Sequence, residues 1–144
     1  MATDAIIDSS VIVALLTPEK HLEWASNKMR KYASFHALDL SFYGVANAIQ
    51  HKVSDGFDSN DATASFKRAE EMMNLFTVHN FSEVIIDSLT KALEQKIAVY
   101  NAAFLSLADK PKIPLLTLDM KLAKNLEHTK YDEFVEYPNK PSHK

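Results

Sequence analysis

The stretch "DAIIDSSVIVALL", residues 4–16, carries the strongest fold signal in this chain of 144 residues. Its first five residues form a short apolar run between two aspartates, which predicts a buried strand over residues 4–8. The segment that follows offers Ser9 or Ser10 as a helix N-cap and ends before Pro18, so it predicts a helix. The same order of strand and helix recurs along the chain and decides the fold class.

The rest of the chain continues this alternation. Further strands are predicted at residues 36–40, 77–80, 113–119 and 133–137. Helices are predicted at residues 18–32, 41–53, 59–76, 81–97, 99–110 and 120–128. This pattern predicts an α/β fold with a twisted, mainly parallel, four- to five-stranded sheet flanked by helices. We expect a single domain over residues 1–137 and a disordered tail over residues 138–144.

Composition excludes several classes of protein. The net charge is −3 and the pI is near 6.0, so nucleic acid would have to be bound by local basic patches. The chain has no cysteine, which excludes disulfides and thiolate metal sites and is typical of a cytoplasmic protein. No apolar run approaches the roughly 20 residues of a membrane span, so we expect no membrane partner. The histidines show no HxxxH or HExxH spacing, which argues against zinc.

Two aspartates directly end predicted strands. Asp8 ends the first strand, and Asp119 ends the strand over residues 113–119. Because ligands of parallel sheets bind outside the carboxyl ends of the strands, we expect the two carboxylates to meet there. Acids that meet repel each other, and a divalent cation with oxygen ligands is the usual group between them. Taken alone, each aspartate could instead be an N-cap of the helix that follows it.

The motifs around these aspartates resemble those of PIN domains of the VapC toxin type, over residues 4 to about 136. In that family, an Asp at the end of the first strand is followed two positions later by Ser, Thr or Asn, as in Asp8 and Ser10. A T-x-D motif follows the fourth strand, as in Thr117 and Asp119. The resemblance implies the PIN fold and Mg²⁺- or Mn²⁺-dependent hydrolysis of RNA by four acids. It also implies a homodimer and an antitoxin-like protein partner.

Two of the four family acids are absent here. Gly44 stands where the family has Glu, in "GVAN", whose Asn47 matches the family Asn. Asn101 stands where the family has Asp, in "YNA". Taken alone, Gly44 could reflect close helix packing and Asn101 could be an N-cap. Against the family pattern, we interpret Gly44 as a vacant acid position rather than as a packing device.

The resemblance therefore predicts a degenerate acidic site with weak cation binding, because two formal negative charges are lost. Its candidate residues are Asp8 and Asp119 as catalytic and metal-binding residues, Asn101 as a catalytic residue, and Ser10, Thr117 and Asn47 as substrate-binding or supporting residues. Asp39 is a candidate for a compensating ligand. We expect a VapC-like protein that keeps RNA or partner binding with weak or lost cleavage. The alternatives are an active Mg²⁺/Mn²⁺-dependent endoribonuclease toxin and a structural or protein-binding module that does not bind nucleic acid.

Overall fold

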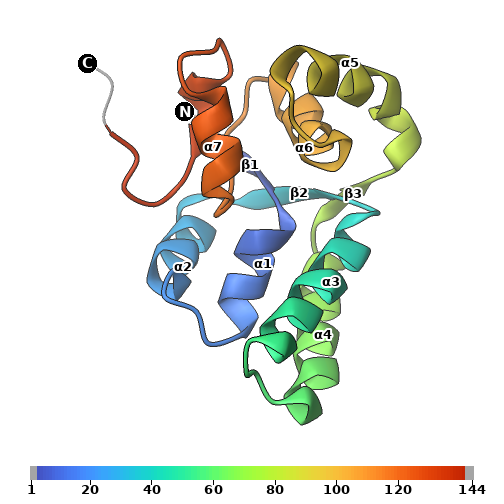
Figure 1. Ribbon diagram of the computed structural model, residues 1–144, viewed down its shortest axis with the longest axis vertical. Coiled ribbons are helices and arrows are strands. Elements are labelled where there is room, and N and C mark those ends of the chain that lie inside the picture. Colours follow the sequence, from blue (N-terminus) through green and yellow to red (C-terminus); the bar gives the residue numbers. More distant parts are fainter. Residues whose placement is uncertain (1–2, 142–144) are drawn as a thin grey trace.

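The computed structural model describes residues 3–141 and shows an α/β fold built on a five-stranded sheet (Figure 1). The strand order is β3-β2-β1-β4-β5, and each neighbouring pair is parallel. The strands are β1 (Asp4–Ile7), β2 (Ser34–Leu38), β3 (Thr77–His79), β4 (Leu115–Leu116) and β5 (Val135–Glu136). The predicted parallel α/β sheet is thus confirmed, with β1 at its centre.

Helices cover both faces of this sheet. In Figure 1, α1 to α4 lie below the sheet and α5 to α7 lie above it. The helices are α1 (Ser9–Leu16), α2 (Leu22–Lys31), α3 (Ser41–Ser54), α4 (Ser59–Met73), α5 (Ile85–Gln95), α6 (Val99–Asp109) and α7 (Met120–Leu126), with short 3-10 helices η1 (Phe81–Glu83) and η2 (Asp132–Phe134). Among helices within residues 3–141, none combines the length and apolar character that crossing a membrane requires.

The core has two parts because neighbouring strand residues point to opposite faces of the sheet. Ala5 and Ile7 belong to the cluster that packs against α1 to α4, whereas Ile6 belongs to the cluster with α6 and α7. In β4, Leu116 belongs to the first of these clusters and Leu115 to the second. Burial on both faces explains why residues 5–7 of β1 and both residues of β4 are apolar rather than alternating with polar residues.

Several boundaries differ from the predictions. The strand predicted at residues 36–40 lies two residues earlier, and the helix predicted from residue 18 begins at Leu22. The helix predicted over residues 81–97 is divided into η1 and α5. A capping box explains the division, because the Asn80 side chain accepts from the Ser82 amide while Glu83 accepts from the Asn80 amide at 2.8 Å.

The first residues of the segment predicted as a tail, residues 138–144, contact the rest of the domain. Pro138 is buried, and the Lys140 ammonium donates to the carbonyl of Val135 at 2.5 Å and to that of Asp132. Hydrogen bonds to backbone carbonyls therefore hold this segment against η2 and β5. Residues 142–144 lie outside the described residues.

Candidate functional site

Asp8 is both the N-cap of α1 and the centre of a buried polar network. Its backbone is extended, and its Oδ1 accepts from the Ser10 amide at 3.0 Å and from the Ser10 hydroxyl. Its Oδ2 accepts from the Thr117 hydroxyl. Burial raises the pKa of the Asp8 carboxyl, while the hydrogen bonds from Ser10 and Thr117 oppose that rise. Asp8 therefore caps helix α1 and also takes part in the candidate site.

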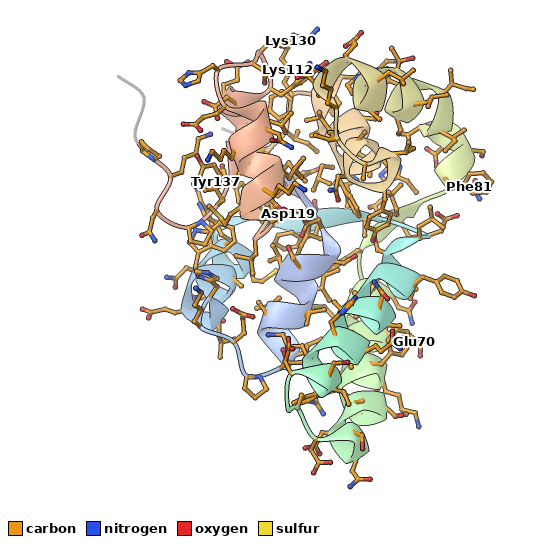
Figure 2. All side chains as sticks on the ribbon, viewed as in Figure 1. Glu70, Phe81, Lys112, Asp119, Lys130 and Tyr137 are labelled. Carbon is orange, nitrogen blue, oxygen red and sulfur yellow. The ribbon has the colours of Figure 1, made fainter. Side chains whose placement is uncertain are left out.

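Thr117 and Asp119 bring the second strand end into this network. Asp119 is the N-cap of α7, and its Oδ1 accepts from the Leu122 amide at 3.0 Å. The Thr117 hydroxyl accepts from the backbone amide of Asp119 at 3.0 Å while donating to the Asp8 carboxylate, so it links Asp8 to the backbone at Asp119. The Ser10 hydroxyl accepts from the amide of Leu118 at 3.0 Å. Figure 2 shows Asp119 at the start of α7, on the side facing α1.

Asn101 lies in the first turn of α6 and joins the same network. Helix α6 has Ala98 as its N-cap, so the interpretation of Asn101 as an N-cap is wrong. The Asn101 amide Nδ2 donates to Asp119 Oδ2 at 3.5 Å. A neutral donor thus faces the carboxylate at the position where the family pattern places a further acid.

The space beside Gly44 is filled by two hydroxyl groups that the sequence reasoning missed. Ser9 Oγ and Tyr100 Oη lie 2.7 Å apart, and a Cβ at position 44 would overlap both of them. Burial raises the pKa of the Tyr100 hydroxyl, which keeps it protonated as a hydrogen-bonding group. The interpretation of Gly44 as a vacant acid position stays a prediction, and the structure adds that the ends of two neighbouring side chains lie in this space. The signal in the sequence was the polar Tyr100 directly before Asn101.

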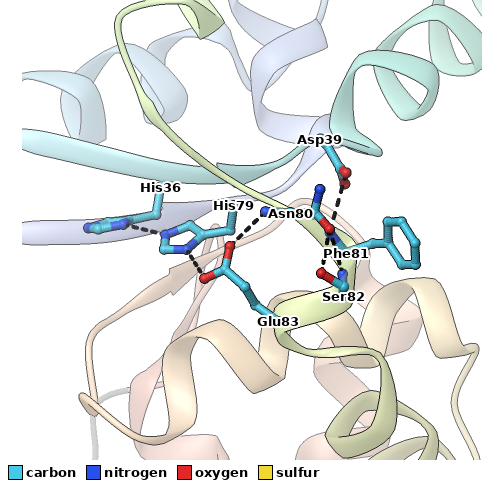
Figure 3. Close-up of polar contacts among 7 residues, drawn as sticks. All are labelled: His36, Asp39, His79, Asn80, Phe81, Ser82 and Glu83. Atoms are coloured by element: carbon cyan, nitrogen blue, oxygen red, sulfur yellow. Dashed lines mark hydrogen bonds and ion pairs between the residues drawn. The ribbon is translucent and has the colours of Figure 1, made fainter.

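Asn47 and Asp39 stand apart from the network. Asn47 is exposed and lines a surface hollow of about 310 Å³ with Tyr43, Gly44 and Tyr100. Asp39 accepts from its neighbouring Leu40 amide at 2.7 Å and from the Phe81 amide at 3.3 Å, so it holds η1 (Figure 3). Within residues 3–141, no hydrogen bond joins either side chain to Asp8 or Asp119.

The donor set does not fit a tightly held divalent cation. Across residues 3–141, no group of three or more His, Asp or Glu side chains is placed to hold a metal ion. Both oxygens of Asp8 and both oxygens of Asp119 already accept hydrogen bonds. Mg²⁺ needs carboxylates to hold it beside phosphate groups, and two carboxylates with one amide supply little of that charge.

A parallel sheet with D-x-S after β1 and T-x-D after β4 is the arrangement of a PIN domain. The chain is 35% identical over 119 residues to Ribonuclease VapC3 of Pyrobaculum aerophilum, covering 82% of this chain and 91% of the relative. It belongs to the VapC-type branch of the PIN-domain family. No protein-family model matches the chain.

Solved structures support the fold. A toxin–antitoxin complex from Klebsiella pneumoniae has a TM-score of 0.67 at 15% identity, covering 95% of this chain and 99% of that one. A crystal structure from Pyrobaculum aerophilum has a TM-score of 0.60 at 24% identity, covering 87% and 81%. VapC20 of Mycobacterium tuberculosis, a toxin that cleaves the sarcin–ricin loop, has a TM-score of 0.61 at 12% identity, covering 83% and 94%. At these identities, the likeness concerns the fold.

Proposed function

We propose that this chain is a VapC-like protein whose single PIN-like domain, residues 1–137, retains a binding role while RNA cleavage is weak or lost. The observation that carries the proposal is the replacement of both missing acids by uncharged hydrogen-bonding groups. The hydroxyls of Ser9 and Tyr100 fill the space beside Gly44, and the Asn101 amide donates to Asp119. We infer that neutral hydrogen-bonding groups have taken the place of the two missing acids.

Metal-assisted hydrolysis needs a cation that activates water and stabilises the leaving oxygen. Both tasks depend on carboxylates that retain the cation, and here only Asp8 and Asp119 remain. Asp8 is engaged on both oxygens by Ser10 and Thr117, and its burial disfavours its charged form. We therefore expect Mg²⁺ or Mn²⁺ to bind weakly.

The binding role that we propose involves RNA, a small antitoxin-like protein or a second copy of the chain. The neighbouring structure from Klebsiella pneumoniae is a toxin–antitoxin complex, which supports a protein partner. Lys121 and Lys124 are exposed on α7, directly after Asp119, and provide a local positive charge for phosphates despite the net charge of −3.

A cleavage assay tests the loss of activity. Wild type, Asp8→Asn and Asp119→Asn are purified in parallel and incubated with RNA in Mg²⁺ or Mn²⁺, with Asp61→Asn as a control for an exposed acid on α4. We expect no cleavage that depends on Asp8 or Asp119. Robust cleavage that both site variants abolish and Asp61→Asn retains would establish the active endoribonuclease instead.

An RNA-binding assay separates the proposal from a module that does not bind nucleic acid. Wild type and a Lys121→Gln/Lys124→Gln variant are titrated with single-stranded RNA at several salt concentrations. Affinity that falls with salt and is weaker in the variant supports RNA binding. Absence of binding at low salt would favour the protein-binding alternative.

A further inference from the structure

A chain of four titratable side chains crosses half of the sheet. The imidazole Nε2 of His36 on β2 lies 3.0 Å from Asp4 Oδ2 on β1. His36 Nδ1 lies 2.9 Å from Nε2 of His79 on β3, and His79 Nδ1 lies 3.3 Å from Oε1 of Glu83 on η1. Figure 3 shows His36, His79 and Glu83 in line. The chain thus links three parallel strands and the 3-10 helix that follows them.

Counting protons shows which state of the two histidines completes this chain. An ionised carboxylate only accepts hydrogen bonds, so the ring nitrogens facing Asp4 and Glu83 must both carry protons. The bond between His36 and His79 needs one proton on one of the two inner nitrogens and a lone pair on the other. Three protons on four ring nitrogens mean that one histidine is neutral and the other is an imidazolium.

The ionised state of the carboxylates, on which this count depends, has its own support. The hydrogen bond with His36, followed by that from Ser34 at 2.8 Å, lowers the pKa of Asp4. The hydrogen bond from the Asn80 amide, followed by that with His79, lowers the pKa of Glu83. Both carboxyls are therefore charged at neutral pH.

Other acids near η1 have partners elsewhere. Asp39, between β2 and α3, accepts from the Leu40 and Phe81 amides. Asp87 on α5, the helix that packs on η1, pairs with Lys91 at 2.6 Å. The charged groups hydrogen-bonded to the two imidazoles are thus Asp4 from β1 and Glu83 from η1, one at each end.

We propose that His36 and His79 share one proton and form a pH-sensitive latch that holds η1 against β3. A second proton would place two N–H groups face to face, whereas loss of the shared proton would leave two protons for three hydrogen bonds. Either change removes one bond of the chain, so the latch is complete only over a limited window of pH. The inference does not depend on the proposed function.

The latch acts next to the candidate site. Phe81 of η1 and Ile85 of α5 line an apolar cavity of about 130 Å³ together with Leu38 and Tyr100. Tyr100 is the residue whose hydroxyl occupies the space beside Gly44. If the latch opened, η1 would be free to move, and with it Phe81, which lines this cavity.

Nitrogen NMR of the histidine side chains tests proton sharing directly. Spectra of the wild type between pH 5 and 9 report the protonation of each ring nitrogen, with exposed His51 on α3 as the internal control. We expect a single proton shared between the inner ring nitrogens of His36 and His79 at neutral pH. Two neutral rings or two imidazolium rings at pH 7 would overturn the proposal.

Hydrogen exchange tests the effect on η1. After correction for intrinsic exchange, protection of the Phe81–Val84 amides should fall about fivefold at pH 5 and at pH 9 relative to pH 7, the change expected from one lost hydrogen bond. Protection of the buried α1 amides should not change. His79→Gln keeps a group that can bond to His36 but does not titrate, so its η1 protection should be independent of pH.

The latch would be overturned if η1 protection in His79→Gln varied with pH as it does in the wild type. Equal η1 protection at all three pH values in the wild type would also overturn it. If His79→Gln does not fold, His36→Gln replaces the other imidazole and is read in the same way.

Discussion

The hydroxyls of Ser9 and Tyr100 lie 2.7 Å apart in the space that a side chain at position 44 would need. The two residues come from α1 and α6, and they meet over a glycine of α3. A glycine within a helix costs about 1 kcal/mol relative to alanine. Here the missing Cβ makes room for a hydrogen bond between the two other helices, which offsets that cost.

Gly44→Ala should destabilise the wild-type protein by about 1 kcal/mol. The added Cβ gains helix propensity of ~1 kcal/mol, but it breaks the Ser9–Tyr100 bond at a cost of ~1 kcal/mol and adds overpacking of at least ~1 kcal/mol. Urea denaturation measures the difference. In a Ser9→Ala/Tyr100→Phe background, both overlapping hydroxyls are gone, and Gly44→Ala should become neutral or stabilising. A stabilised single variant would contradict the packing role of Gly44.

Restoring the family acids should restore cation binding. The Gly44→Glu/Asn101→Asp variant adds two negative charges, the one at position 101 directly beside Asp119, and we expect Mn²⁺ to bind roughly tenfold tighter or more. Calorimetry measures the affinity, and RNA cleavage is the second readout. Because a side chain at position 44 must displace the Tyr100 hydroxyl, Asn101→Asp alone should give part of the gain without repacking.

The control for this variant adds charge outside the site. Gln50→Glu places a carboxylate on an exposed position of the same helix, α3. It should leave Mn²⁺ affinity unchanged. Equal affinities in Gln50→Glu and in the double variant would show that the site is not where we place it.

The two aspartates at the strand ends could be predicted from the sequence. The hydroxyl groups that fill the space beside Gly44 could not. Asp8 and Asp119 each end an apolar run, and parallel strands bring their carboxyl ends to one edge. Ser9 and Tyr100 are 91 positions apart and on different helices, so their contact depends on how α1 and α6 pack. No local pattern encodes that packing.

The contact between His36 and His79 in the sheet could not be predicted from the sequence either. His36 and His79 are 43 positions apart, and the register of β2 with β3 brings them together. The strand expected at residues 36–40 in fact ends at Leu38, because Asp39 and Leu40 already lead into α3. An error of two residues preserves which face each side chain occupies, but it shifts which residues of neighbouring strands lie opposite each other.

Asp8 should make stability depend on pH in a recognisable direction. Burial raises its folded pKa above the unfolded value of about 3.9, so its contribution is fully present below that value and is lost as pH rises through the folded pKa. Asp8→Asn removes this titration. The stability of Asp8→Asn relative to wild type should therefore increase as pH rises above about 4.

Urea denaturation between pH 4 and 8 measures this difference. Asp61→Asn, on an exposed position of α4, should show no comparable trend. A difference between Asp8→Asn and wild type that falls with rising pH would mean that hydrogen bonds from Ser10 and Thr117 outweigh burial at Asp8.

Lys91 joins α5 to the end of α6, and its removal should destabilise the protein. Its ammonium lies 2.6 Å from Asp87 and 3.0 Å from Asp109, and its side chain is 8% exposed. Lys91→Met keeps most of the apolar stem but leaves two carboxylates without their shared cation. We expect a loss of about 1–2 kcal/mol at pH 7, measured by urea denaturation. Lys67→Met, at an exposed position of α4, is the matched control and should have little effect.

The pH dependence of Lys91→Met identifies the cause of that loss. The hydrogen bond from Lys91 lowers the folded pKa of Asp87, so the stability from this pair is present above the unfolded pKa and is lost as pH falls through the folded value. The cost of Lys91→Met should therefore shrink as pH falls below about 4, where Asp87 takes up a proton and no longer needs the cation. A cost that stays constant down to pH 3 would show that Lys91 stabilises the α5–α6 contact through its apolar stem rather than through its charge.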